Sequence, residues 1–157
     1  MIASNSKARL HYREAGSVDA AAMLNCRAGD NTAGPGDSRI AAYLDGHHHP
    51  QQALPPRTAF VALDGDDVVA YIAGHATTRH GCNGEVQYLY VAPSYRRAGV
   101  ASALLELMAR WFDARAIRRV CVNADLESEG AQPFYIARGA QRLNRYWFIW
   151  EDIATVI

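Results

Sequence analysis

The sequence predicts a mixed α/β domain in which a central, mostly antiparallel sheet of about six to seven strands is flanked by helices on both faces. Two strand-like runs joined by Asp64-Gly65-Asp66-Asp67 predict an antiparallel hairpin in the first half of the chain. Further on, a strand ended by Ala92-Pro93 precedes an amphipathic helix and another apolar run, which is typical of a right-handed crossover. The 157 residues suffice for one core, so we expect a single domain over residues 1–157.

In the first half of the chain, the predicted strands and helices are separated by residues that favour turns. Ser17 can cap the first helix, because a serine hydroxyl accepts a hydrogen bond from an unpaired N–H of the first turn. Several Gly and Pro between residues 28 and 57 interrupt the pattern around a second, shorter helix. The expected strand, two helices and two hairpin strands are 10–14, 18–27, 37–44, 58–63 and 68–77.

A strand at 85–91 is expected next, after a turn at the pair Asn83-Gly84. Side chains of a strand point alternately to its two faces. The sequence therefore predicts two sets on opposite faces, namely Glu85, Gln87, Leu89 and Val91 against Val86, Tyr88 and Tyr90.

A helix is expected at 99–114, because apolar and polar side chains recur there with helical spacing. Its apolar stripe is Val100, Leu104, Leu107, Met108 and Trp111, and its polar face is Ser102, Glu106, Arg110 and Asp113. A strand at 119–122, a helix at 132–138 and a last strand near 146–150 follow. The resulting order is strand, helix, helix, three strands, helix, strand, helix, strand.

The turn between the strand 85–91 and the helix 99–114 has the features of an anion site. Arg96 and Arg97 precede the helix, and Gly99 and Ala101 leave its rim without large side chains. The first N–H groups of a helix have no partner within it, and the helix dipole directs positive charge toward them. We expect this turn to bind a cofactor that carries a diphosphate.

Two blocks of the chain resemble the GNAT superfamily of N-acetyltransferases. The family signature is a hydrophobic strand, then V-x-P, then Q/R-x-x-G-x-G/A opening a helix, and it is matched by Leu89-Tyr90-Val91-Ala92-Pro93-Ser94-Tyr95-Arg96-Arg97-Ala98-Gly99-Val100-Ala101. Residues 131–140 are similar to the family's A-x-x-F-Y-x-x-x-G-F helix. The chain departs from the family at Ser128, where Asn is frequent, and at Ala140, where an aromatic residue is usual.

The resemblance implies an N-acetyltransferase that moves the acetyl group of acetyl-CoA to a primary amine of a small molecule or peptide, by direct attack in a ternary complex. The backbone of residues 89–91 would pair with the pantetheine amides like an added strand, and the Tyr90 N–H could polarise the thioester carbonyl. Residues that would contact acetyl-CoA are Leu89, Tyr90, Val91, Arg96, Arg97, Ala98, Gly99, Val100, Ala101, Ser128 and Tyr135.

Glu85 and Tyr135 are the candidate catalytic residues. Glu85 lies eleven residues before Arg96, where several family members carry a glutamate that activates water, and the alternative is a solvated charge at the start of a strand. His75 or a chain of waters could replace it as the base, unless His75 is a partly buried structural imidazole. By resemblance, Tyr135 would protonate the departing thiolate. Its alternative role is that of a core aromatic beside Phe134.

Composition limits the partners and the compartment. The chain has 16 basic and 16 acidic residues, so no net charge favours nucleic acid or an anionic membrane. Residues 1–10 contain no apolar signal segment, and no run approaches membrane-spanning length. Cys26, Cys82 and Cys121 are widely spaced, which favours free thiols in a reducing compartment. We expect a soluble cytoplasmic protein.

Other functions find less support in the sequence. The run His47-His48-His49 has no further ligand at metal-site spacing, and 64–67 lacks the later ligands of a calcium loop, so no metal is expected. A phosphoryl-transfer enzyme would need a G-K-[ST] phosphate-binding loop, which this sequence does not contain. A non-catalytic acyl-CoA-binding sensor or assembly module is the alternative that the resemblance leaves open. The apolar run 146–150 either forms a buried last strand or faces a second copy of the chain. A homodimer is compatible with the second alternative.

Overall fold

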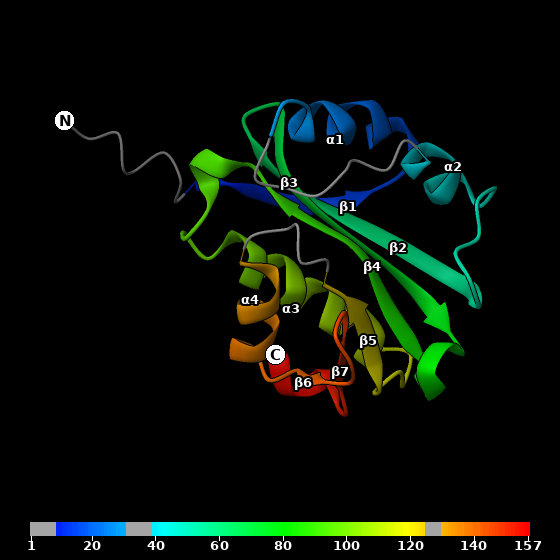
Figure 1. Cartoon of the computed structure of the whole chain (residues 1–157). Coiled ribbons are helices and arrows are strands. Elements are labelled where there is room, and N and C mark those ends of the chain that lie inside the picture. Colours follow the sequence, from blue (N-terminus) through cyan, green and yellow to red (C-terminus); the bar gives the residue numbers. More distant parts are fainter. Residues whose placement is uncertain (1–8, 31–38, 125–129) are drawn as a thin grey trace.

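A sheet in the order β1-β2-β3-β4-β5-β7-β6 forms the middle layer of the computed structural model (Figure 1). The structure describes residues 9–30, 39–124 and 130–157. Neighbouring strands are antiparallel except β4 and β5, which are parallel. The predicted mixed, mostly antiparallel sheet is confirmed. Its strands are β1 (His11–Ala15), β2 (Ala53–Asp64), β3 (Asp67–Thr77), β4 (Gly84–Val91), β5 (Val120–Asn123), β6 (Gln141–Arg142) and β7 (Trp147–Trp150).

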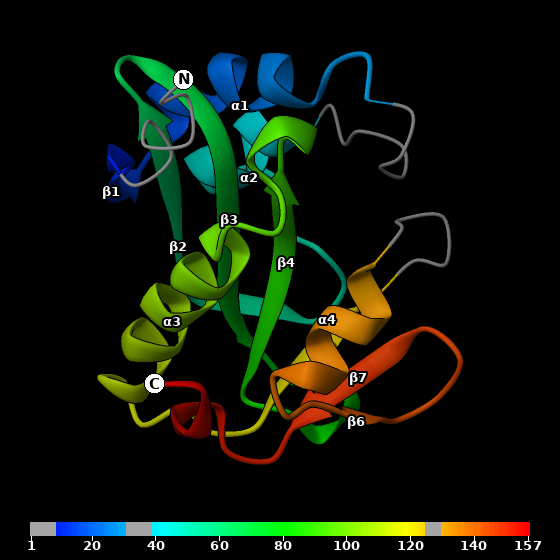
Figure 2. The ribbon, with the colours of Figure 1, turned by 90° about the vertical axis from the view of Figure 1, so that its left-hand side faces the viewer.

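Helices cover both faces of the sheet, as the sequence predicted. One face carries α1 (Ala20–Arg27) and α2 (Ile40–Asp45), and the other carries α3 (Val100–Asp113) and α4 (Ala131–Ala137) (Figure 1). Short 3-10 helices lie at Ser17–Asp19, Arg79–Gly81, Pro93–Tyr95 and Ile153–Val156. In the view of Figure 2, α3 appears on one side of β4 and α4 on the other.

The buried stripe of α3 is wider than predicted. Leu107 is only partly buried, whereas Leu105, Ala109 and Phe112 are buried beside the expected residues. The reason is that α3 contacts both the sheet and the 3-10 helix Ile153–Val156, so two neighbours cover it instead of one. Sequence periodicity detects a stripe, but the neighbours of a helix set its width.

A β-bulge in β4 changes which residues share a face. Tyr88 pairs with Ala73 and Val86 pairs with Gly74, which leaves Gln87 as the extra residue. The predicted alternation is therefore wrong beyond Val86. Glu85 lies on the same face as Tyr88 and Tyr90, toward α1 and α2, whereas Val86, Leu89 and Val91 pack in the core against α3.

The same bulge marks the point where β4 and β5 part. The two strands pair only at Gly84–Val120, Glu85–Cys121 and Val86–Val122. Residues 87–91 of β4 pair with β3 on one side and have no strand along the other among the described residues. Half of the backbone hydrogen-bonding groups of this segment are therefore turned toward an open side of the sheet.

The start of the first helix differs from the prediction that Ser17 caps it. The helical segment begins with the 3-10 helix Ser17–Asp19, whose N-cap is Gly16. The Asp19 carboxylate, at the third position of this helix, accepts a hydrogen bond from the Gly16 N–H at 3.0 Å and forms an ion pair with Arg13 at 2.9 Å. An ionised carboxylate is a stronger acceptor than a hydroxyl and adds a favourable charge near a helix N-terminus.

Other boundaries moved by a few residues. The expected second helix begins at Ile40, and the expected start at Asp37 lies outside the described residues. Gly84 belongs to β4 and not to the preceding turn, and β2 begins earlier, at Ala53. The strand β6 was not predicted, because two exposed residues give no periodicity.

The C-terminal apolar run is a strand of the core. Phe148, Ile149 and Trp150 are buried in β7, while Trp147 is partly covered and Tyr146 is exposed. The burial of this run accounts for its composition without a second copy of the chain. The homodimer stays a prediction.

Gly84 should not tolerate a side chain. A Cβ there would lie 2.7 Å from the Phe112 ring and 2.8 Å from Cγ2 of Ile117. We expect Gly84→Ala to lower the free energy of unfolding by about 1–3 kcal/mol, measured by urea denaturation. Gly16→Ala is the matched control, because its Cβ would meet nothing within 4 Å, and it should change stability by less than about 0.5 kcal/mol. Equal midpoints for both variants would contradict this packing.

Candidate active site

A cavity of about 470 Å³ lies between the C-terminal half of β4, the N-terminus of α3 and the helix α4. Its wall contains all but two of the residues predicted to contact acetyl-CoA. Ala98 does not line it, and Ser128 lies outside the described residues. The predicted residues in the wall are Leu89, Tyr90, Val91, Arg96, Arg97, Gly99, Val100, Ala101 and Tyr135, and they are joined by Arg27, Tyr95, Ser102, Gly130, Ala131 and Phe134.

The floor of the cavity is the unpaired edge of β4. Leu89, Tyr90 and Val91 line it, and they belong to the segment beyond the bulge that has no pairing with β5. Buried backbone N–H and C=O groups need partners, so this edge is suited to a ligand that carries amides in an extended chain.

The anion site predicted at the start of α3 is built from backbone. The first bond within the helix runs from the Ala103 N–H to the Gly99 carbonyl at 3.0 Å, so the N–H groups of Val100, Ala101 and Ser102 precede it. Gly99 has φ of 82° and makes no side-chain cap. A Cβ there would meet no atom of the described chain within 4 Å, so within the protein it is the left-handed conformation that requires glycine, and the bare rim expected for a ligand stays a prediction.

The two arginines of the turn have different roles. Arg96 donates from Nε to the Val91 carbonyl at 2.7 Å and from Nη2 to Asp30 at 2.6 Å. Arg97 has φ of 61° and an exposed side chain at the rim. The charge of Arg96 is therefore matched within the protein, and Arg96 fixes the turn to the end of β4, whereas Arg97 is placed to meet an anion.

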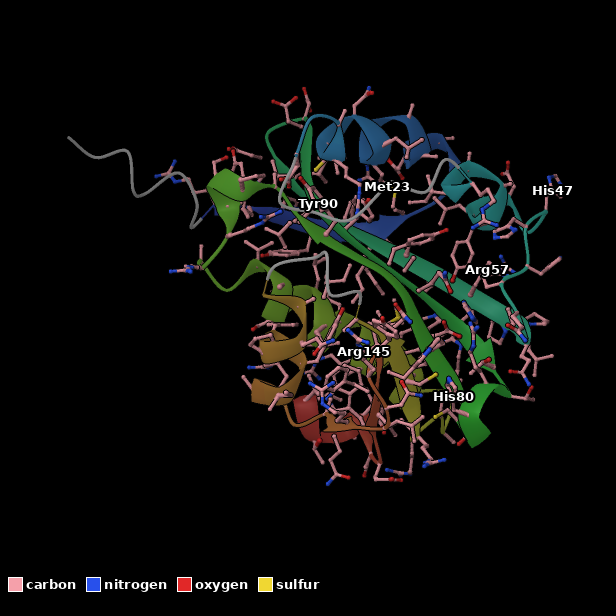
Figure 3. All side chains as sticks on the ribbon, in the orientation of Figure 1. Met23, His47, Arg57, His80, Tyr90 and Arg145 are labelled. Atoms are coloured by element: carbon pink, nitrogen blue, oxygen red, sulfur yellow. The ribbon has the colours of Figure 1, made fainter. Side chains whose placement is uncertain are left out.

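Asp30 joins the turn to the end of α1. Its carboxylate also accepts the Tyr90 hydroxyl at 2.6 Å, and its side chain is only 5% exposed. The guanidinium groups of Arg27 and Arg96 lie 5.2 Å and 5.6 Å from the Tyr90 ring centre. Tyr90 lies beneath α1 beside Met23 (Figure 3). Burial and the hydrogen bond to Asp30 raise the pKa of Tyr90, so its hydroxyl stays protonated.

Sequence reasoning did not single out Asp30 or Arg27. They lie on the first helix and just after it, about sixty residues before the turn that they contact. A single acidic residue near the end of a helix does not form a recognisable motif. Asp30 reaches Arg96 only because α1 packs over β4.

Tyr135 is a core aromatic that also reaches the cavity, and its role as the acid stays a prediction. Its ring packs edge-on against Trp150 at 5.7 Å and against Phe134 at 5.4 Å, and the residue is 5% exposed. It also lines the cavity. Burial raises the pKa of Tyr135, so at neutral pH the hydroxyl holds its proton and can donate it to a basic atom in the cavity.

Glu85 does not line this cavity. It is 2% exposed at the start of β4, with Oε1 3.5 Å from His75 Nε2 and Oε2 3.6 Å from Arg79 Nη1. The alternative of a solvated charge is therefore wrong. His75 is fully buried and its Nδ1 lies 2.8 Å from the Tyr43 hydroxyl. The two candidate bases form one buried group on the α1–α2 side of the sheet.

The cysteines and histidines offer no further reactive centre on the described part of the chain. Cys82 and Cys121 are buried free thiols, and burial raises the pKa of each. Burial likewise raises the pKa of Cys26 to about 11. Among residues 9–30, 39–124 and 130–157, no three His, Cys, Asp or Glu side chains converge on a metal position. His49 instead lies 2.8 Å from Arg57.

The helices that the structure describes are all too short or too polar to cross a membrane.

Comparison with known proteins gives a consistent result. Residues 26–140 match the family described as the acetyltransferase (GNAT) family. A crystal structure described as an acetyltransferase of that family, from Desulfovibrio desulfuricans, aligns with 16% identity and a TM-score of 0.72, covering 92% of this chain and 99% of its own. No curated protein matches the sequence.

Two further solved structures contain coenzyme A together with a second bound molecule. The NatC complex bound to Gag peptide and CoA aligns at 16% identity and a TM-score of 0.69, covering 90% of this chain and 97% of its own. The diaminobutyrate acetyltransferase EctA from Paenibacillus lautus was solved in complex with L-2,4-diaminobutyric acid and coenzyme A. It aligns at 13% identity and a TM-score of 0.68, covering 92% of this chain and 96% of its own. At these identities the likeness concerns the fold.

The Asp30 contacts should be energetically coupled to Tyr90. We expect Asp30→Asn and Tyr90→Phe to destabilise the protein non-additively, with a coupling of about 1 kcal/mol in a double-mutant cycle followed by urea unfolding. The control cycle pairs Asp30→Asn with Tyr12→Phe, since Tyr12 packs in the core on the α3 side of the sheet. It should be additive within about 0.5 kcal/mol. Additivity in both cycles would contradict the contact.

Proposed function

Because this chain belongs to the GNAT acetyltransferase family, we propose that it is an enzyme that transfers the acetyl group of acetyl-CoA to a primary amine of a small molecule or peptide. Family membership confirms the predicted family and its co-substrate, acetyl-CoA. The observation that carries the proposal is one cavity lined by the unpaired edge of β4, the N-terminus of α3 and the Tyr135 side chain. The free thiols support the cytoplasm as its compartment.

The cofactor half of the proposal rests on backbone groups. The N–H groups of Val100, Ala101 and Ser102 would hold the diphosphate, with Arg97 at the rim. The edge at residues 89–91 would pair with the pantetheine amides. A neutral chain suits this mode of binding, because the positive potential comes from a helix end and not from a basic surface.

Bound acetyl-CoA would supply the activated acyl group, and the protein would manage two protons. The acceptor nitrogen forms a bond to the acetyl carbon as the carbon–sulfur bond breaks. Tyr135 would give its hydroxyl proton to the departing sulfur, which its place in the cavity wall supports. The N–H of Tyr90 was expected in the role of polarising the thioester carbonyl, but it is turned toward Tyr71 of β3, because the Ala92 N–H two residues on donates to Val69. The Leu89 N–H is on the open side of β4 and would donate to the carbonyl oxygen on which negative charge develops.

Glu85 would take the proton of the amine through water. An amine with a pKa near 10.4 is almost entirely protonated at neutral pH, so an acceptor for that proton aids attack. Glu85 lies across the sheet from Leu89 and Val91, on the face with Tyr88. The acceptor would therefore approach from the α1–α2 side. Solved relatives with a peptide and with diaminobutyric acid make both acceptor classes reasonable to test.

Acetyl-CoA binding should depend on the rim of α3. We expect Ala101→Glu to weaken binding at least about tenfold in calorimetry, because a carboxylate would face the diphosphate. The variant should stay folded, since an acidic residue in the first turn favours the helix. Ala103→Glu places the same charge in that turn away from the cavity, and it should retain affinity within about threefold. Equal loss in both variants would overturn this placement of the diphosphate.

Turnover should depend on the Tyr135 hydroxyl. With amines drawn from polyamines, amino acids and peptides, we expect Tyr135→Phe to lower kcat about 100-fold, measured as release of CoA thiol. Its affinity for acetyl-CoA should change less than about twofold, because the ring and its packing remain. The exposed Tyr146→Phe is the matched control. Equal kinetics for Tyr135→Phe and the parent would remove Tyr135 from the mechanism, and binding without turnover on any amine would favour the sensor.

A further inference from the structure

The buried group around Glu85 is larger than the proposed reaction requires. His75 and Glu85 are directly paired across β3 and β4, and their side chains are 0% and 3% exposed. His75 Nε2 and Glu85 Oε1 face each other at 3.5 Å, and neither atom makes a hydrogen bond to the described part of the chain. Leaving two buried polar atoms unpaired is costly, so their juxtaposition needs an explanation.

The proton positions follow from which atoms can donate. Tyr43 is fully buried, and burial raises the pKa of its hydroxyl, so it remains protonated beside His75 Nδ1. If Nδ1 carried the imidazole proton, the bare Nε2 would face a carboxylate oxygen with no hydrogen between them. If Nε2 carries it, the Tyr43 hydroxyl donates to Nδ1 and a donor at Nε2 lies 3.5 Å from the acceptor Oε1 of Glu85. Only the second arrangement of the neutral ring sets a donor against an acceptor at both ring nitrogens.

The carboxylate is held from both sides. Arg79 faces Oε2 at 3.6 Å, and its guanidinium is itself fixed by Gln51 at 3.1 Å and by the Trp147 ring at 4.5 Å. Both contacts to Glu85 are longer than a tight hydrogen bond, and a shift of about 0.5 Å would close them. Such contacts in ligand-free sites often tighten when substrates bind.

We propose that Tyr43 and His75 are positioning residues for Glu85: the Tyr43 hydroxyl donates to His75 Nδ1, which places the imidazole proton on Nε2, and this N–H orients the carboxylate that receives the amine proton. This inference rests on the proposed function. Neither residue touches a substrate in it, and both act through Glu85.

The groups that surround the carboxylate determine what a pH profile reports. They come from α2, β3, the 3-10 helix before β4, β4 itself and β5, and are Tyr43, His75, Arg79, Cys82, Tyr88 and Cys121. Burial raises the pKa of Tyr43 and of both thiols, so they stay neutral between about pH 5 and 8. The kinetic test therefore compares variants of His75 and Glu85, and not of Tyr43 or the thiols.

The kinetic test compares His75→Leu with His75→Gln, using one amine throughout. Loss of the N–H donor disfavours the ionised carboxylate, so we expect the acidic half-maximum of kcat to rise by about one pH unit in His75→Leu. The amide of His75→Gln can donate to the same oxygen and should restore most of the parent profile. In Glu85→Gln, the fall of kcat on the acidic side of the pH profile should be absent. A uniform fall of kcat with no shift in either His75 variant would overturn the proposal.

A spectroscopic test does not depend on turnover. Nitrogen-15 NMR of the His75 ring at pH 7.5 should show a protonated Nε2 and an unprotonated Nδ1. Tyr43→Phe should move the Nδ1 signal because its donor is lost, and Tyr12→Phe on β1 should leave it in place. An Nδ1–H tautomer or a doubly protonated ring in the parent would overturn the proposal. If no amine is acetylated, the proposed function fails while this measurement still decides the tautomer.

Discussion

The extra residue in β4, Gln87, is the constraint from which the arrangement of the site follows. Beyond it β4 no longer pairs with β5, and residues 89–91 of this unpaired segment line the cavity. The same residue also inverts the alternation of side chains. Leu89 and Val91 thereby join the core against α3, while Glu85 and Tyr88 face α1 and α2. One irregularity thus separates the face that packs against α3 from the face that carries Glu85.

Local pairing of charge explains how a chain with no net charge can offer an anion site. Arg96 is matched by Asp30, and Arg79 by Glu85. The positive potential at the cavity therefore comes from the N-terminus of α3. Its N–H groups are fixed in the backbone, so they need not change position when an anion binds. The Asp30 contact also ties the end of α1 to the turn, so that the two helical layers meet at the cavity mouth.

The two halves of the site differ in how far the sequence predicts them. The turn at Arg96–Gly99 and the ring of Tyr135 are local features, because each belongs to a short segment with its own pattern, and the structure places both at the cavity. Asp30, Arg79 and Tyr43 have no such pattern. They reach their partners only through the packing of α1, α2 and a 3-10 helix on the sheet.

By itself the sequence predicted the mixed sheet with helices on both faces and the turn before the long helix that lines the cavity. These depend on hydrophobic period and on turn chemistry, which act between residues close in the chain. Tertiary structure alone decided the bulge at Gln87, the width of the buried face of α3 and the burial of Glu85 against His75. Those depend on which surfaces meet, because strand register and burial are set by neighbours far away in the chain.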